Sequence, residues 1–325
     1  MTDDDKIHAC LLGGAIGDAM GANIEFWSLA HIRDHGIRPA RHFTDDTQMA
    51  LFTAEGLIRA VVRAQSRGIC APEGVVHHAL LRWYRTQGGR PMMQTCDVGL
   101  IADSRLHAEH APGMTCLSAL KAAAHFGQPA RNDSKGCGTI MRVAPCALIA
   151  RDAEQAERLA RDTSALTHGH VLGQEAAVAQ ARILYELLHD ATLEDAMHAV
   201  RLSPPIMRAI HLAMTAPADG APETVERLGA GWVAEEALSI AIYAARVGRT
   251  LDDALRIALV HSGDSDSTAA IAGNLLGLLR PAEVLASDMP LDGRDLIARI
   301  AQDLVVASNP GEGFADKMFN LYPGW

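Results

Sequence analysis

Apolar residues recur at helical spacing along most of the chain. The clearest case follows Asp46, where they stand at Met49, Leu51, Phe52, Ala54, Leu57, Ile58, Val61 and Val62. Similar patterns predict helices over 7–22, 47–66, 74–86, 115–125, 139–149, 153–163, 171–190, 192–202, 205–216, 232–247, 251–258, 266–279 and 292–307. No segment alternates apolar and polar residues as a half-buried strand does. We therefore predict an all-α fold, a single compact multi-helix domain over residues 1–325.

The first of these helices is studded with glycine. Gly13, Gly14, Gly17 and Gly21 leave one face nearly bare, although each glycine lowers helix stability. Such a face is typical of a helix on which another backbone packs closely. After this helix we expect a long polar loop from Glu25 to about Phe43. We expect the glycine- and proline-containing tail, residues 309–325, to pack its aromatic side chains on the surface: Phe314, Phe319, Tyr322 and Trp325.

Composition narrows the class of protein. Hydrophobic residues make up 49% of the 325 residues and aromatic residues only 4%, which favours closely packed helices over sheets. The net charge is −10 and no basic run occurs, so nucleic acid is not expected as the main partner. The six cysteines lie singly. We expect neither a signal peptide nor a membrane span, and hence a cytoplasmic location.

Two acidic motifs stand at predicted helix starts. Asp264 and Asp266 are separated by one residue and followed by Ser267, and Asp45 and Asp46 follow Thr44. Taken singly, each motif is compatible with an N-cap and a first-turn acid. If the fold brings the motifs together, however, four carboxylates share one pocket, and a multivalent cation would have to balance them. Oxygen-only ligands favour Mg²⁺ or Mn²⁺ over zinc.

These motifs resemble the ADP-ribosylglycohydrolase family, which includes the dinitrogenase reductase-activating glycohydrolases. The resemblance runs from about residue 7 to about residue 285 and rests on five ordered motifs. They are residues 17–26 (GDAMGANIEF), 44–47 (TDDT), 136–145 (GCGTIMRVAP), 166–168 (LTH) and 262–267 (SGDSDS). The resemblance implies a domain of the ADP-ribosylglycohydrolase type that hydrolyses the bond between a protein side chain and C1 of the ribose distal to adenine.

The resemblance also implies roles for particular residues. Two divalent cations would be held by Thr44, Asp45, Asp46, Asp264, Asp266 and Ser267 and would grip the diol of the reacting ribose. Glu25 would lie on a mobile loop close to that ribose. The substrate would be a mono-ADP-ribosylated protein or another ADP-ribose derivative. Asp45, Asp46 or Glu25 could position the attacking water, and the sequence does not rank them.

A glycine-containing loop precedes the predicted helix 139–149. Backbone N–H groups at such a junction can hold a diphosphate, and the resemblance assigns this task to Gly136, Cys137, Gly138 and Thr139. By the same resemblance, His168 lies near the nucleotide. On its own, a histidine at a helix start is usually a polar end residue. We expect Arg142 to form an ordinary helix salt bridge.

The linkage that is cut is left open by the residues. Arginine, serine, acetylated ADP-ribose and polymer are all targets in the family. Asp97 lies in a segment, 95–99, that resembles an aspartate, hydrophobic, glycine segment of the dinitrogenase reductase-activating branch. A carboxylate can meet the forked donors of a guanidinium with two hydrogen bonds, which favours arginine. Alternatively, Asp97 caps the segment that follows it.

Two other functions remain open at this stage. Oxygen-ligated metal pairs also serve phosphoryl transfer, so a metal-dependent phosphoester hydrolase is one alternative. A non-catalytic protein that binds ADP-ribose or metal is the other, because the fold of this family has been reused without activity. All six ligand-type positions here carry oxygen side chains, which favours a catalytic member.

Overall fold

The computed structural model describes residues 1–323, which form helices joined by short connections and contain no strand. The helices are α1 (Asp3–Gly21), α2 (Leu29–His35), α3 (Asp45–Arg67), α4 (Pro72–Thr86), η1 (Leu100–Ala102), η2 (Ser104–His107), α5 (Met114–Ala122), η3 (Cys137–Arg142), α6 (Ala144–Leu148), α7 (Ala153–Ala165), α8 (Val171–Leu188), α9 (Leu193–His198), α10 (Pro204–Thr215), α11 (Pro222–Glu226), α12 (Ala234–Val247), α13 (Leu251–Leu259), α14 (Ser265–Leu279), α15 (Pro281–Leu285), α16 (Arg294–Ser308) and α17 (Phe314–Met318). The predicted all-α single domain is confirmed.

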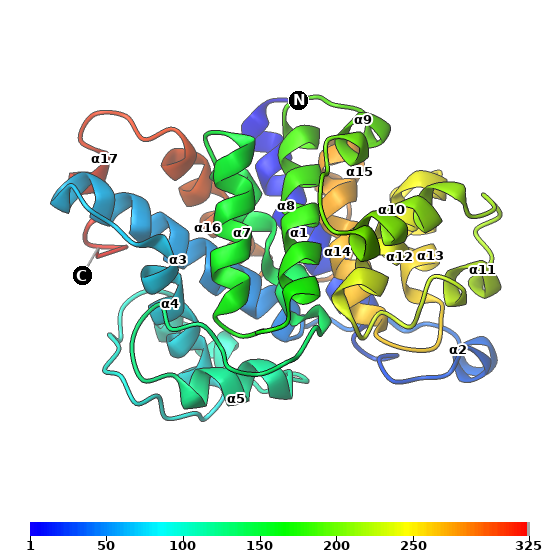
Figure 1. Cartoon of the computed structure of the whole chain (residues 1–325), viewed down its shortest axis with the longest axis horizontal. Coiled ribbons are helices and arrows are strands. Elements are labelled where there is room, and N and C mark those ends of the chain that lie inside the picture. The colour runs from blue at the N-terminus through cyan, green and yellow to red at the C-terminus, as the bar shows by residue number, and fades with distance from the viewer. Residues whose placement is uncertain (324–325) are drawn as a thin grey trace.

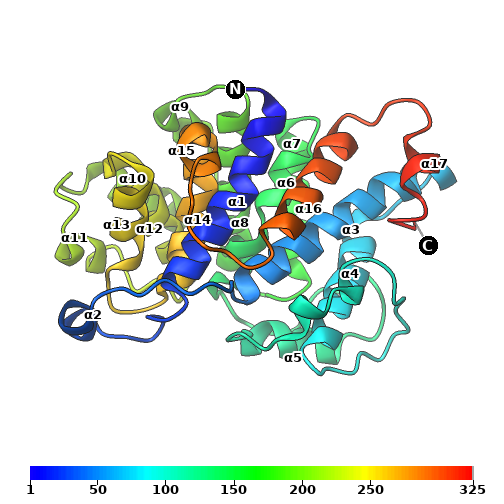
Figure 2. The same cartoon turned by 180° about the vertical axis from the view of Figure 1, so that it is seen from behind.

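Helices α1 and α14 form the centre of the molecule and lie side by side in both views (Figures 1 and 2). They run antiparallel, and the bare glycine face of α1 is the contact surface. A Cβ atom added at Gly13 or Gly17 would overlap the carbonyl group of Gly273 or Ala269 on α14. Close packing was predicted for this face, and the structure supplies the partner helix.

This antiparallel pairing fixes which ends of the helices meet. Gly21, the last residue of α1, lies against the backbone of Asp266 in the first turn of α14. Helix α3 also begins at this end of the pair and then runs outward, with α4 and α16 packed along it (Figure 2). On the other side α8, α12 and α13 pack against α14, and α7 packs on α8 (Figure 1). Three helix ends that carry sequence motifs therefore converge.

The structure corrects several predicted elements. Residues 29–35, predicted to be part of a loop, form α2, which Ser28 caps by accepting a hydrogen bond from the His31 N–H. The single helix predicted over 139–149 is interrupted at Val143, before Pro145, and becomes η3 and α6. The short helices η1, η2, α11, α15 and α17 were not predicted, because a single helical turn has no recognisable periodicity.

The C-terminal tail is less superficial than predicted. Phe314 and Tyr322 are buried in the core, whereas Phe319 is exposed as expected. The Pro323 carbonyl accepts a hydrogen bond from buried Arg59, which fastens the tail to α3. Trp325 lies outside the described residues. Among the described residues, no helix is long and apolar enough to cross a membrane.

Candidate active site

The first acidic motif forms the start of α3. Thr44 is the N-cap residue, and its hydroxyl accepts a hydrogen bond from the Asp46 N–H. Asp45 and Asp46 follow in the first turn, where the helix dipole favours negative charge. Both are nearly inaccessible, at 5% and 3% exposure. Capping explains why a helix begins here, but it does not explain two buried carboxylates.

The second acidic motif forms the start of α14. Asp264 is the N-cap residue and its carboxylate accepts from the Ser267 N–H, while Asp266 lies in the first turn. Gly263 precedes them with φ near +144°, a conformation that favours glycine. The two aspartates are only 3% exposed. As predicted from sequence, both motifs open a helix, although the N-cap residue is a threonine in the first and an aspartate in the second.

The fold brings the two motifs together. The Ser267 hydroxyl donates to the Asp46 carboxylate over 3.2 Å, although the residues are 221 positions apart. Oxygens of Glu25, Asp264 and Asp266 all lie within 4.8 Å of one another. We call Glu25, Asp45, Asp46, Asp264 and Asp266 the acid cluster. Its side chains come from the starts of α3 and α14 and from the turn after α1. Its most exposed member is Glu25, which is half-buried.

Asp18 holds the start of α3 beside the acid cluster. It belongs to the motif at residues 17–26, but it was not predicted to be a site residue. This fully buried carboxylate on α1 accepts hydrogen bonds from the N–H groups of Thr44 and Thr47, at 2.9 and 3.0 Å, and from the Thr47 hydroxyl. It thus satisfies donors at the start of α3 that no helical carbonyl can reach. An aspartate within an apolar, glycine-rich helix is the sequence signal that could have identified it.

Burial and mutual repulsion dominate the electrostatics of the acid cluster. Burial, followed by the charge of Asp264, raises the pKa of Glu25 to about 8. Burial, followed by the charges of Asp18 and Asp264, raises the pKa of Asp45 to about 8, although the Gly113 N–H hydrogen bond opposes this shift. The pKa values of Asp46 and Asp266 are raised well above the usual range by burial and by neighbouring aspartates. Without a cation, these carboxyls resist ionisation together.

The residues at this site fit a hard cation. Asp46 Oδ2 is buried and has no hydrogen-bond partner within the described chain, a costly state for a carboxylate oxygen. Among the described residues, no lysine or arginine forms an ion pair with a member of the acid cluster. Divalent cations bound by oxygen ligands would supply the missing positive charge.

The loop predicted to hold a diphosphate lies beside the acid cluster. Cys137 Sγ donates to the Asp264 carboxylate over 2.8 Å. Two of the backbone donors expected for the diphosphate are already used, because Gly136 N–H donates to Ser134 Oγ and Cys137 N–H to the Trp232 carbonyl. The Gly138 N–H lies in the first turn of η3, where a helical N–H has no partner within the helix.

His168 and Arg142 contact this loop at Gly138. His168 is buried, and a Cβ atom added at Gly138 would come within 3.0 Å of its ring. Burial, followed by the charge of Arg142, lowers the pKa of His168 to about 3, so the imidazole is neutral. Arg142 forms no salt bridge with any residue from 1 to 323, contrary to the prediction. It donates instead to the carbonyls of Gly138 and Thr163, which an isolated helix pattern could not reveal.

Thr139 is also committed to the fold, since its hydroxyl donates to the Gly173 carbonyl over 2.8 Å. Its side chain therefore anchors η3 to α8. The four predicted loop residues do come together with the acid cluster and His168. Their proposed contact with a diphosphate stays a prediction.

Asp97 does not join the acid cluster. Its largely exposed carboxylate pairs with Arg85 at 2.7 Å, and the next carbonyl, that of Val98, accepts from buried Arg59 and Arg82. Arg59 is 14 residues beyond Asp45 on α3, which corresponds to about 20 Å along the helix axis. The structure thus gives Asp97 a different partner, and its predicted contact with the leaving group gains no support.

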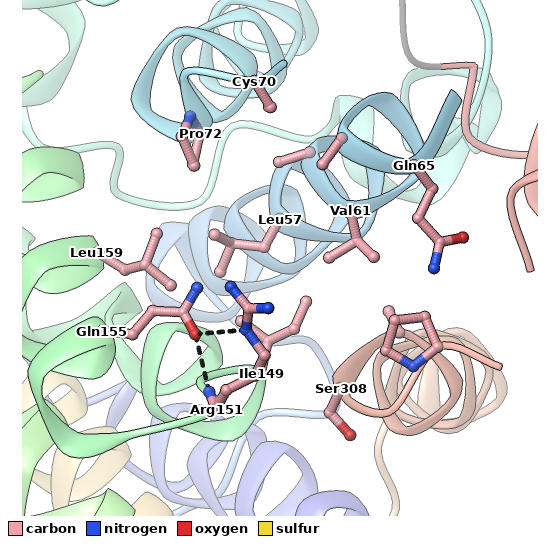
Figure 3. Close-up of a pocket in the computed structure, with 14 residues that line it drawn as sticks. Leu57, Val61, Gln65, Cys70, Pro72, Ile149, Arg151, Gln155, Leu159 and Ser308 are labelled. Atoms are coloured by element: carbon pink, nitrogen blue, oxygen red, sulfur yellow. Dashed lines mark hydrogen bonds between the residues drawn. The ribbon is translucent and has the colours of Figure 1, made fainter. Parts of the chain in front are cut away.

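A separate cavity of about 410 Å³ lies along the C-terminal half of α3 (Figure 3). Apolar side chains such as Leu57, Val61 and Leu159 line it, and the Arg151–Gln155 pair closes one edge. No carboxylate is among its lining residues. The acid cluster lies instead at the N-terminal end of α3, which begins with Asp45 and Asp46.

Comparisons with known proteins identify the family and the fold that this chain resembles. The sequence model of the ADP-ribosylglycohydrolase family matches residues 1–312. An uncharacterized protein from Archaeoglobus fulgidus is 26% identical over 293 residues, which cover 84% of this chain and 87% of that protein. The ADP-ribosylarginine hydrolase Tri1 of Pseudomonas putida is 28% identical over 296 residues, covering 85% and 70%. A solved structure described as an ADP-ribosylglycohydrolase-related protein complex superimposes with a TM-score of 0.68 at 26% identity, covering 94% of this chain and 99% of its own.

Proposed function

The chain belongs to the ADP-ribosylglycohydrolase family, and we propose that it removes ADP-ribose from arginine side chains of modified proteins. The observation that carries the proposal is the Ser267–Asp46 hydrogen bond, because it unites the two acidic motifs in one buried site. The choice of arginine is supported by the relatives named ADP-ribosylarginine hydrolase Tri1. Asp97 does not contribute to this choice.

The site would hold two divalent cations, Mg²⁺ or Mn²⁺, through Thr44, Asp45, Asp46, Asp264, Asp266 and Ser267. Bound there, the cations would supply Lewis-acid polarisation of water and of the ribose diol oxygens. The support from this chain is the set of oxygen ligands and the unpartnered Asp46 Oδ2. Cys137 donates to Asp264 and so orients one carboxylate toward the same space.

In the proposed reaction a water molecule attacks C1 of the distal ribose. The C1–N bond breaks, the hydroxyl joins C1, and the remaining proton goes to the departing guanidine nitrogen. Carboxylates near C1 stabilise the positive charge that develops on the ribose. Asp45 accepts from Gly113 N–H and Asp46 from Ser267, whereas no hydrogen bond engages the Glu25 carboxylate among the described residues. These contacts favour Glu25 as the group that positions the water.

Incubation of the protein with ADP-ribosylated arginine and serine peptides, with Mg²⁺, Mn²⁺ or a chelator, tests the proposal. We expect free ADP-ribose from the arginine peptide only when a divalent cation is present. Release from the serine peptide alone would reassign the linkage. Release of inorganic phosphate would indicate a phosphoester hydrolase, and ADP-ribose binding without any turnover would indicate a non-catalytic protein.

A further inference from the structure

Two exposed aromatic rings lie beside the acid cluster. Phe26 and Trp232 are stacked, with ring centroids 5.0 Å apart and planes 22° apart. Their residues are 69% and 39% exposed, in a chain in which aromatic residues make up only 4%. Stacking on each other does not remove these rings from water, so the fold keeps apolar surface exposed at this place.

Both rings are tied to the backbone around Asp264. The Phe26 N–H donates to the carbonyl of Gly263, the residue before Asp264. Gly231, the residue before Trp232, packs against Asp264, since a Cβ atom added there would lie 3.3 Å from the Asp264 Cβ. Phe26 also directly follows Glu25 of the acid cluster. The aromatic pair therefore lies next to the reacting end of the proposed substrate.

The backbone of Phe26 is held in an unusual conformation. Its φ is 67°, in the left-handed region, where a bulky side chain is strained. Glycine or asparagine would adopt this conformation more easily. Strain of this kind persists where the surrounding contacts fix it, and here the result is a ring placed over Trp232.

From this arrangement we propose that Phe26 and Trp232 form the platform that receives the guanidinium of the target arginine as it leaves C1. The proposal rests on the function proposed above and assigns its linkage specificity to this pair instead of Asp97. A guanidinium is planar and always charged, and it stacks on aromatic faces. Serine offers neither a plane nor a charge. The carboxylates of Glu25 and Asp264 add attraction for the same cation.

An aliphatic substitution separates the aromatic ring from apolar character alone. Phe26→Leu retains an apolar side chain and the backbone strain but removes the ring. Trp232→Leu likewise replaces an aromatic ring with a smaller apolar side chain. Phe26→Asn relieves the strain and also lacks the ring. Phe319→Leu is the matched control, because Phe319 is exposed in the C-terminal segment, away from these elements.

We expect Phe26→Leu and Trp232→Leu to lower kcat/KM for an arginine-linked peptide about 5- to 30-fold, the range expected for a desolvated cation–π contact. Phe26→Asn should lose as much, whereas Phe26→Tyr should restore most of the activity. The Kd for ADP-ribose, which lacks the leaving group, should change less than about threefold in each variant. The Phe319→Leu control should behave as the wild type.

The same measurements can overturn the proposal. A loss of ADP-ribose affinity equal to the loss of kcat/KM would show that the rings stack on the adenine instead. Full activity in Phe26→Leu would show that the pair has no part in recognition. The proposed function is judged separately on the wild type, which must release ADP-ribose from the arginine peptide. If it does not, both proposals fail.

Discussion

The repulsion within the acid cluster leads to a prediction for the metal-free protein, namely that its stability falls as the pH rises from 6.5 to 7.5. Asp45 has a pKa of about 8 in the folded chain, against an ordinary value of 3.8 for an aspartate. Between these values the folded state binds one more proton at Asp45 than the unfolded state does. Raising the pH therefore favours unfolding. Below about pH 4 both states are protonated and the contribution disappears.

The size of the effect follows from the shift. Each pH unit within this window costs about 1.4 kcal/mol for one group, so Asp45 alone accounts for about 1.4 kcal/mol between pH 6.5 and 7.5. Glu25 adds less, because it is only half-buried and solvent screens its charge. For a chain of this size the expected change in Tm is about 2 °C for 1.4 kcal/mol.

The buried histidines oppose this trend to a smaller extent. Burial lowers the pKa values of His77, His78 and His168 to about 4, 3 and 3. An unfolded histidine, with a pKa near 6.5, is half-protonated at pH 6.5 and nearly neutral at pH 7.5, so each of these residues raises stability by only about 0.3 kcal/mol across the window. The carboxyls of the acid cluster dominate the change, because the strongly raised pKa values of Asp46 and Asp266 add to the effect of Asp45.

Thermal unfolding of chelator-treated protein at pH 6.5, 7.0 and 7.5 provides the assay. Asp45→Asn should reduce the slope, because one titrating carboxyl is gone while those of Asp46 and Asp266 remain. Added Mn²⁺ should stabilise the wild type more at pH 7.5 than at 6.5, since the cation binds the ionised carboxylates. A metal-free Tm that is constant or rises across this range would refute the reasoning.

Four further substitutions test other parts of the site. Asp266→Asn should abolish both Mn²⁺ binding by calorimetry and ADP-ribose release, and a variant that keeps either one would remove Asp266 from the ligand set. Asp18→Asn should cost about 1 to 3 kcal/mol by chemical denaturation, because the amide NH2 replaces one of the two acceptor oxygens and would face a buried donor of α3. It should also weaken Mn²⁺ binding, and unchanged metal affinity would argue against its positioning role. Gly138→Ala should weaken ADP-ribose binding while sparing Mn²⁺, since the added Cβ would lie 3.0 Å from both Cys116 Sγ and the His168 ring; equal ADP-ribose affinity would leave the loop a structural role only. Gly17→Ala should destabilise the protein by about 1 to 3 kcal/mol through overpacking against α14, whereas Gly311→Ala, where no atom lies within 4 Å of the added Cβ, should have little effect.

The sequence by itself determined the long helices and the position of the two acidic motifs at helix starts. Repeated apolar spacing identified the long helices, from α3 to α16, because amphipathic periodicity is a local property of the chain. The two acidic motifs were recognisable for the same reason, since the N-cap and first-turn positions of a helix are set by neighbouring residues. The bare glycine face of α1 correctly indicated a close helix contact. Short helices such as α2, with seven residues, lacked enough residues to show a period.

Tertiary structure alone decided which residues meet. The antiparallel pairing of α1 and α14 depends on glycines that face each other across the contact, such as Gly13 and Gly273. It places Asp266 beside the end of α1. From there Asp18 reaches the start of α3, and Asp46 reaches Ser267. Asp97, judged from a local likeness, proved to be an exposed partner of Arg85, while Phe26 and Trp232 came together across 206 positions of the sequence. Contacts between distant residues depend on how whole helices pack, and one sequence read locally does not contain that information.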